Sequence, residues 1–419
     1  MYELHAAALD GSVKRTLAVL SRRAVDIDQG DRKGATPLMC AAGLGHSPVV
    51  KIFLSEGANL AIVGDRGFTA LHMSAQRGHL AATKLLVKAG ADLEAAGSGA
   101  GCTPLHLAAN KGHSEVMRVL IEAGANPNSR ALSGATSLYS AAQNGHVDAA
   151  KLLLRAKANP LLTFLSSSGQ GFVPLDMAAG NGHLEVVREL IQEHGVEGCG
   201  GVSGGVDALR AAAENQHMDI MNVLTSAGVV DTGTALIAAA GFSRESSMKF
   251  LLQQQEWKSS GERATYFKAC DPFGRTAMLR SIFACRSCSP RTTRLLVDAG
   301  ADTTTAVRLL PDEKGVICFD DTPLALAELL LSGKKIKGKD ATESQLHSLE
   351  ATRRLLMRVE AVHAVSWLWA NDVPSVTHAA AKRTGRSTKA TSTPLILRQR
   401  TGRPRVLLAA LLRHSSKPY

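Results

Sequence analysis

Histidine is the first residue type in this chain whose spacing invites a chemical interpretation. The chain has 419 residues, and six of its 14 histidines follow one another at intervals of 33, 34, 33, 37 and 34 residues. These six are His46, His79, His113, His146, His183 and His217, and all but the last come directly after glycine. Imidazole binds transition metals, but the ligands of one ion must all lie about 2 Å from it. Residues that recur once per structural unit are too far apart for this, so we expect no metal ligands among them.

The cysteines contain a second candidate site. Cys285 and Cys288 have the CxxC spacing of zinc and redox sites, with Cys270 before them and Cys318 after them as single residues. Because no second CxxC completes the set, we expect ordinary packing of these cysteines, since a free thiol behaves as a small apolar group, and a zinc or redox site is the alternative. The seven cysteines are an odd number without a pairing pattern, which favours a reducing compartment.

The sequence lacks the motifs of known catalytic sites. The glycine-rich stretch 97–102 lacks the last glycine of a dinucleotide-binding loop, and no phosphate loop, nucleophile elbow or zinc-protease histidine pair occurs. We therefore expect a protein that is not an enzyme and needs no cofactor.

The elements that position these residues share the period of the histidines. A threonine or valine stands ten residues before each of the first five periodic histidines, and proline follows it in most copies. These residues are Thr36, Thr69, Thr103, Thr136 and Val173. A threonine hydroxyl caps a helix N-terminus, and proline tolerates the first helical position because no N–H is needed there. In the third copy, Leu105, Ala108 and Ala109 predict a short helix, and the apolar residues of 116–121 predict a second one. Such a hairpin buries its faces only by stacking on its neighbours.

The pattern resembles the ankyrin repeat family. The third copy carries the Thr103-Pro104-Leu105-His106-x-Ala108 signature, and further copies extend the resemblance over roughly residues 2–369. The resemblance implies an all-α fold, an ankyrin-repeat solenoid of stacked helix-turn-helix units with projecting turns. It also implies that the histidines after glycine fix the turn between the two helices by hydrogen bonding to backbone.

One copy departs from the pattern at the end of its second helix. Lys157 stands where other copies have Gly57, Gly90 and Gly124, a position suited to left-handed backbone. We therefore expect Lys157 to be left-handed at a cost of about 1 kcal/mol.

The repeats and the charge divide the chain into three parts. We expect regular repeats over 1–230, degenerate repeats with insertions and a C-terminal cap over 231–369, and a basic, disordered tail over 370–419. The formal charge is +11, and residues 371–419 hold ten Lys or Arg against a single acid. No secretory signal and no apolar run of about 20 residues occurs, so we expect a soluble, monomeric protein of the cytoplasm. Because the tail is basic, the alternative is a nuclear protein whose tail contacts nucleic acid.

The resemblance also implies where a partner binds. Family members bind protein partners on the concave side, through the turn tips and the exposed end of the first helix. By register, the partner-binding residues are Arg32, Lys33, Arg66, Phe68, Gln76, Arg77, Asn110, Lys111, Gln143, Asn144, Phe172 and Asn181. Phe68 and Phe172 are candidate anchors, with folding back onto neighbouring turns as the alternative. Because we expect none of Phe68, Arg77 and Lys111 to face the stack, replacing them should spare the fold.

The expected function is therefore that of a protein-binding scaffold or adaptor. The alternative is a nuclear regulatory factor whose basic tail contacts nucleic acid.

Overall fold

The computed structural model describes most of the first 301 residues and a final helix. The described ranges are 3–22, 25–65, 67–97, 99–166, 169–200, 204–255, 259–272, 275–283, 290–301 and 347–359, with short pieces between 303 and 340. The chain forms two compact units, Met1–Ala284 and Cys285–Tyr419.

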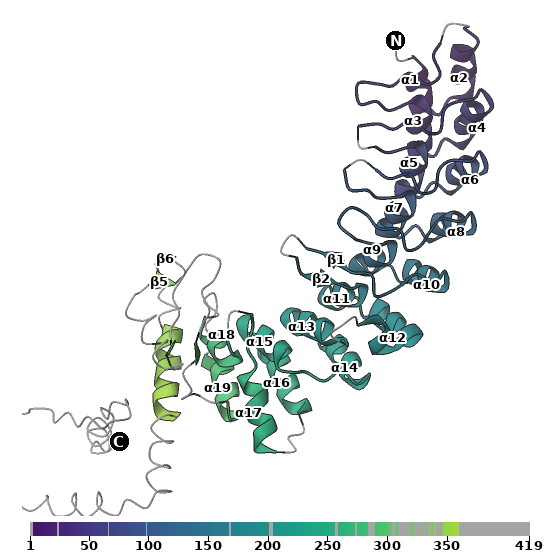
Figure 1. The fold of residues 1–419 in the computed structure, drawn as a ribbon. Coiled ribbons are helices and arrows are strands. Elements are labelled where there is room, and N and C mark those ends of the chain that lie inside the picture. Colours follow the sequence, from purple (N-terminus) through teal and green to yellow (C-terminus); the bar gives the residue numbers. More distant parts are fainter. Residues whose placement is uncertain are drawn as a thin grey trace, which may run out of the picture. The chain divides into compact units, whose positions relative to one another are not determined.

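The first unit consists of helical hairpins stacked in two layers (Figure 1). Each first-layer helix packs on the next: α1 (Glu3–Asp10), α3 (Pro37–Leu44), α5 (Ala70–Arg77), α7 (Pro104–Lys111), α9 (Ser137–Asn144), α11 (Pro174–Gly180), α13 (Val206–Asn215), α15 (Thr234–Gly241) and α18 (Ala277–Phe283). The second layer is α2 (Val13–Leu20), α4 (Ser47–Ser55), α6 (Leu80–Lys88), α8 (Ser114–Glu122), α10 (Val147–Arg155), α12 (Leu184–Cys199), α14 (Met218–Ser226) and α16 (Glu245–Gln254). The predicted solenoid of stacked helix-turn-helix units is confirmed.

The first-layer helices start where the sequence predicts. The Thr36 hydroxyl accepts a hydrogen bond from Met39 N at 3.3 Å, with Pro37 at the first helical position. The Thr136 hydroxyl accepts one from Tyr139 N at 3.1 Å. These bonds satisfy N–H groups that have no partner within the helix.

Small side chains fill the space between the layers. Ala41, Ala42, Ala108 and Ala109 have no exposed surface, so neighbouring helices approach closely. Leucines such as Leu105 complete the core, and burial of each such side chain contributes about 2 kcal/mol.

The turns after the second-layer helices are left-handed. Gly57 and Gly90 both have φ of 82°. Lys157 has φ of 62° at the same position, so this prediction is confirmed. The Asn128 side-chain amide donates to Lys157 O at 3.3 Å, which helps to hold this turn.

The projecting turns lie against one another through backbone hydrogen bonds. Asp65 N donates to Lys33 O and Leu132 N to Ala100 O, each at 2.9 Å. The fifth turn is longer and contains the antiparallel strands β1 (Phe164–Leu165) and β2 (Gly171–Phe172), in which Phe164 pairs with Phe172. The turns are therefore held in place by their neighbours as well as by their own helices.

An inserted helix, α17 (Ser260–Lys268), follows α16. Its Tyr266 hydroxyl donates to a carboxylate oxygen of Asp231 at 2.7 Å, and both residues are buried. The same Asp231 carboxylate accepts from the N–H groups of Gly233, Ala235 and Leu236 at the start of α15. One buried carboxylate thus caps α15 and fixes α17.

The described part of the second unit contains α19 (Pro290–Asp298) and a helix over 347–359. It also contains two antiparallel pairs of two-residue strands, β3 (Val307–Arg308) with β4 (Asp320–Asp321) and β5 (Lys335–Ile336) with β6 (Lys339–Asp340). No helix in the described part of the chain is long and apolar enough to cross a bilayer.

Candidate protein-binding surface

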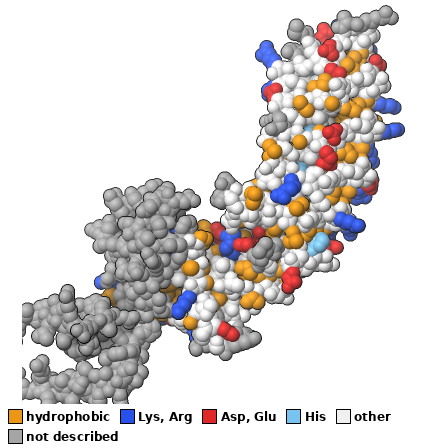
Figure 2. Space-filling view, in the orientation of Figure 1, with side chains coloured by type: hydrophobic (Ala, Val, Ile, Leu, Met, Phe, Trp, Pro, Cys, Tyr) orange, Lys and Arg blue, Asp and Glu red, His pale blue; other side chains and the backbone are white. Residues whose placement is uncertain are grey.

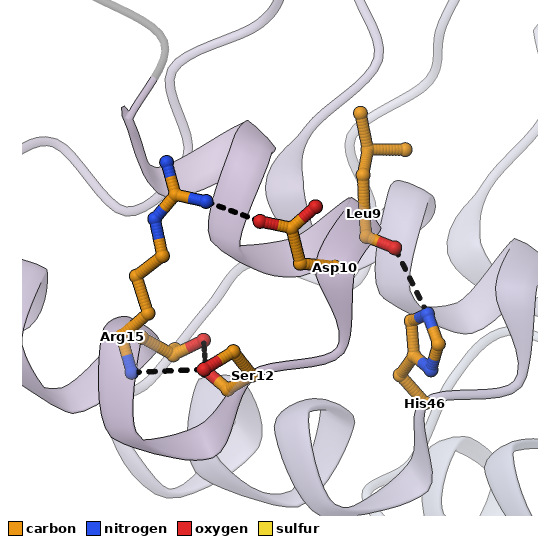
Figure 3. Close-up of polar contacts among 6 residues, drawn as sticks. Leu9, Asp10, Ser12, Arg15 and His46 are labelled. Atoms are coloured by element: carbon orange, nitrogen blue, oxygen red, sulfur yellow. Dashed lines mark hydrogen bonds and ion pairs between the residues drawn. The ribbon is translucent and has the colours of Figure 1, made fainter.

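The histidines after glycine connect consecutive repeats. His46 begins α4, and its Nε2 donates to Leu9 O of α1 at 3.0 Å, near the ion pair of Asp10 with Arg15 (Figure 3). The other five make the equivalent bond at 3.0 to 3.2 Å, to Gly43, Gln76, Asn110, Gln143 and Gly180. Because a carbonyl oxygen only accepts, Nε2 carries the proton. The expected bond to backbone is confirmed, but it is made to the preceding repeat and not to the turn of the histidine's own repeat.

Glycine is needed in each Gly-His pair for a steric reason that the sequence did not reveal. Gly78 has φ of 75°, and a Cβ placed on it would lie 2.6 Å from Nδ1 of His113 in the next repeat. Gly45 and Gly112 stand in the same relation to His79 and His146. The glycine of one repeat therefore leaves room for the histidine of the next.

A second pair of histidines caps first-layer helices. His72 Nδ1 accepts from Thr69 N at 3.1 Å, and its Nε2 donates to Cys102 O at 3.0 Å. His106 makes the same two contacts, with Thr103 N and Ala135 O. Burial lowers the pKa of both imidazoles, so both are neutral. With these bonds, the six periodic histidines, His72 and His106 are structural, and the described residues include no group of His, Cys, Asp or Glu that could hold a metal ion.

Asp176 takes the place of this histidine in the fifth copy. Its Oδ2 accepts from Val173 N at 2.9 Å, while its buried Oδ1 has no hydrogen-bond partner. Burial raises the pKa of the carboxyl to about 7; the Val173 N–H lowers it, nearby Asp207 raises it and Arg210 lowers it. This carboxyl therefore changes charge near neutral pH.

The predicted first-helix residues form one row along the first layer. We name as the first-layer strip the residues at the ends of α5, α7 and α9 and directly after α11: Gln76, Arg77, Asn110, Lys111, Gln143, Asn144 and Asn181. Gln76 is half-buried and the others are exposed. Since consecutive first-layer helices contact each other, the structure brings these residues together in order along the stack.

Some residues of the strip also bond to the preceding repeat. Arg77 Nη1 donates to Gly43 O at 2.7 Å, and Asn181 Nδ2 donates to Gln143 O at 2.9 Å. The expectation that Arg77 stays clear of the stack is wrong, because the flexible side chain reaches a carbonyl that the helix end leaves free. Among the residues that the structure describes, the side chains of Asn110, Lys111 and Gln143 have no hydrogen-bond or ion-pair partner.

The predicted turn-tip residues have two different environments. Arg32 and Lys33 are exposed at the first tip. Phe68 is half-buried, and its ring stacks on His72 with centroids 5.2 Å apart and planes at 8°. Phe172 is half-buried opposite Phe164, which itself stacks on Tyr139. Phe68 thus folds back onto a histidine of its own repeat and not, as in the alternative interpretation, onto a neighbouring turn.

Several predicted features lie outside the described residues. They are Arg66, the pair Cys285 and Cys288 with Cys318, the end of the C-terminal cap after residue 359, and the tail 370–419.

Sequence reasoning missed an apolar row beside the strip. Cys40, Met73, Leu107 and Met177 are half-buried on the first-layer helices, and the last three each stand four residues before the last strip position of their repeat. That spacing places each of them on the same helix face as the strip residue, a signal that was present in the sequence. Gly43 keeps this row open, because a Cβ there would lie 3.3 Å from the Met73 methyl group.

The charge of the surface is mixed. On the face seen in Figure 2, hydrophobic, basic and acidic side chains alternate along the first unit and do not gather into one large patch. Such a surface is typical of a binding module whose contacts are distributed over several repeats.

The first unit is a repeat solenoid in which helical hairpins are stacked and their turns are hydrogen-bonded to one another. A strip of exposed residues along one layer is typical of repeat solenoids that bind a partner. The sequence matches the models "Ankyrin repeats (3 copies)" over residues 4–96 and 93–164 and "Ankyrin repeat" over 170–198. Residues 4–164 and 170–198 are ankyrin repeats, and such repeats are generally non-enzymatic protein–protein interaction modules. No curated protein matches the chain.

Proposed function

We propose that the protein is a non-enzymatic adaptor that binds a protein partner along the first-layer strip and the adjoining turn tips. The observation that supports this most is the row of Asn110, Lys111 and Gln143. These polar side chains are exposed on successive repeats and are not used by any other described residue. Because the helices beneath them are packed on both sides, the row is held rigid before a partner arrives, which lowers the entropic cost of binding.

The chemistry of the strip suggests the kind of partner segment that binds. Met73, Leu107 and Met177 offer apolar contact area, and thioether side chains adapt to varied partners. Arg77 and Lys111 add positive charge beside them, with Arg32 and Lys33 at the first tip. A partner helix or extended segment with apolar side chains flanked by amide or acidic groups would contact both rows.

A charge-balanced pair of variants tests the proposal. In the first, Asn110→Ala, Lys111→Ala and Gln143→Ala remove the unused side chains of the strip. In the control, Lys51→Ala, Lys84→Ala and Glu122→Ala remove exposed side chains from the second layer. Proteins captured from cells by each tagged full-length chain are quantified by mass spectrometry. We expect the strip variant to lose specific partners that the control retains; equal capture by both would contradict the proposal.

A further inference from the structure

The second unit has an open groove between α19 and the helix over 347–359. Its volume is about 460 Å³. Its lining includes four exposed arginines, which we call the rim: Arg291 and Arg294 on one helix, Arg354 and Arg358 on the other. The half-buried Pro290 and Leu355 form the apolar part of the lining, and His347, Glu350 and Ala351 complete it. The helix over 347–359 is the yellow-green helix of Figure 1. A basic rim over an apolar floor is therefore built from two helices of this unit alone.

This groove is more basic than the corresponding surface of two repeats of the first unit. Arg118 and Arg188 each follow an acid by three residues, and they pair with Glu115 at 2.9 Å and Glu185 at 3.6 Å. The sequence 294–301 aligns with 118–125, which places Arg294 in the position of Arg118. Three residues before Arg294, where an acid precedes Arg118, stands Arg291. Three residues before Arg354, on the helix over 347–359, stands Ala351. Arg291 in place of the acid leaves two adjacent positive charges on α19, where α8 and α12 carry an ion pair.

Few acidic groups offset the four arginines. Arg354 pairs with Glu350 at 3.2 Å and Arg294 with Asp298 at 3.8 Å, but both arginine side chains are more than 70% exposed, so water screens these pairs. Within the residues that the structure describes, Arg291 and Arg358 have no ion-pair partner. Two guanidinium groups, one on each side of the groove, are thus available to an anionic ligand.

We propose that this groove binds an acidic peptide segment of a protein partner. Carboxylates of the segment pair with Arg291 and Arg358, since guanidinium matches carboxylate geometry with two parallel hydrogen bonds. An apolar side chain of the same segment packs on Leu355. A small inorganic anion would use the rim alone, whereas a peptide that alternates acidic and apolar residues uses both rim and floor. This surface shares no residue with the first-layer strip.

Selection from a random peptide library displayed on phage tests the proposal. The immobilised full-length chain should enrich peptides that combine Asp or Glu with Leu, Ile or Phe. A labelled synthetic copy of the most enriched peptide is then titrated against wild type and against the Arg291→Gln, Arg358→Gln variant. Loss of two charge pairs should weaken binding at least about tenfold.

A matched control is the Arg118→Gln, Arg188→Gln variant, which removes the same charges from paired positions of the first unit and should bind like wild type. Because the exposed guanidiniums act electrostatically, wild-type affinity should also fall as salt rises, a measurement that needs no variant. Selected peptides without acidic residues, or equal affinity of the groove variant and wild type, would overturn the proposal. Preferential binding of a labelled DNA oligonucleotide at the groove, with no acidic peptide selected, would overturn it in favour of a nucleic-acid site.

Discussion

At the scale of single residues, each Gly-His pair acts between repeats. The histidine bonds to the preceding repeat through Nε2, and its ring also occupies the space beside the preceding repeat's glycine. Sequence reasoning predicted a structural histidine from the spacing of His46 to His217. It did not predict the glycine's second role, because contact between residues of different repeats depends on how the helices stack.

Gly78 and Gly90 have similar left-handed backbones, but only Gly78 has a histidine next to its Cβ position. Comparing them separates the steric role of glycine from its conformational role. Gly90 has φ of 82° with open space around its Cβ position, whereas Gly78 has φ of 75° and faces His113. We expect Gly90→Ala to lower the free energy of unfolding by about 1 kcal/mol, because left-handed alanine is strained. Gly78→Ala should cost about 1 to 2 kcal/mol more, because the methyl group displaces the His113 ring, which belongs to the next repeat and bonds to Gln76 O.

Urea denaturation of both variants measures the difference. The double variant Gly78→Ala, His113→Ala should show less than the sum of the two single losses, since the ring that clashes is gone. Equal destabilisation by the two glycine substitutions would show that the histidine contact contributes nothing.

Asp176 gives the fold a dependence on pH. Its folded pKa of about 7 exceeds its ordinary value of 3.8, so the folded state binds the extra proton between these values. Stability from this group is therefore present at low pH and is lost as pH rises through about 7. Asp176→Asn should remove this loss, making the variant more stable than wild type by an amount on the order of 2 kcal/mol above neutrality.

The buried histidines oppose this trend. Because the pKa values of His72 and His106 are lowered, their contribution is complete above about pH 6.5 and is lost as pH falls. Urea midpoints of wild type and Asp176→Asn between about pH 5 and 8 separate the two effects. If both proteins kept the same pH dependence, the Asp176 carboxyl would not titrate in this range.

At the scale of elements, local signals predicted the helices and missed what long-range contacts decide. Thr36 and Thr136 start their helices as expected, because capping depends on neighbours in the sequence. The sequence predicted insertions within 231–369, but it did not show that helix α17 is held by Tyr266 on Asp231, 35 residues away. Phe68 was expected as an exposed anchor, and only the structure shows its ring on His72.

Two cations of the first-layer strip should differ in their effect on stability. Arg77 donates to Gly43 O across the repeat boundary, while the exposed Lys111 side chain has no such partner among the described residues. We expect Arg77→Ala to lower the free energy of unfolding by about 1 kcal/mol, and Lys111→Ala to change it by less than about half of that. Thermal melting of the two variants checks this, and a larger loss for Lys111→Ala would mean that the register of the strip is misassigned.

At the scale of the whole molecule, the period of the histidines predicted one continuous solenoid, and the structure confirms it over the stacked hairpins of the first unit. The alignment of 294–301 with 118–125 shows that the repeat pattern continues into the second unit. The basic groove there could not be predicted, because it depends on which side chains of α19 and the helix over 347–359 face each other.

The sequence also predicts how the basic tail behaves. Because repeats interact mainly with their neighbours, deletion of residues 374–419 should leave thermal unfolding unchanged. Affinity for a DNA duplex should fall with the deletion, and in the full chain it should fall steeply between about 50 and 200 mM salt. Destabilisation of the truncated chain would mean that the tail packs on the repeats; unchanged DNA affinity would contradict the nucleic-acid alternative.

The central claim is that partners bind the first-layer strip, and site-specific photo-crosslinking in cells tests it most directly. A benzophenone amino acid replaces Asn144 on the strip in one chain and Glu122 on the second layer in another; both positions are exposed. The account predicts discrete protein adducts from position 144 and none, or only weak ones, from position 122. Adducts from position 122 without any from position 144 would place the partner on the other layer and contradict the account.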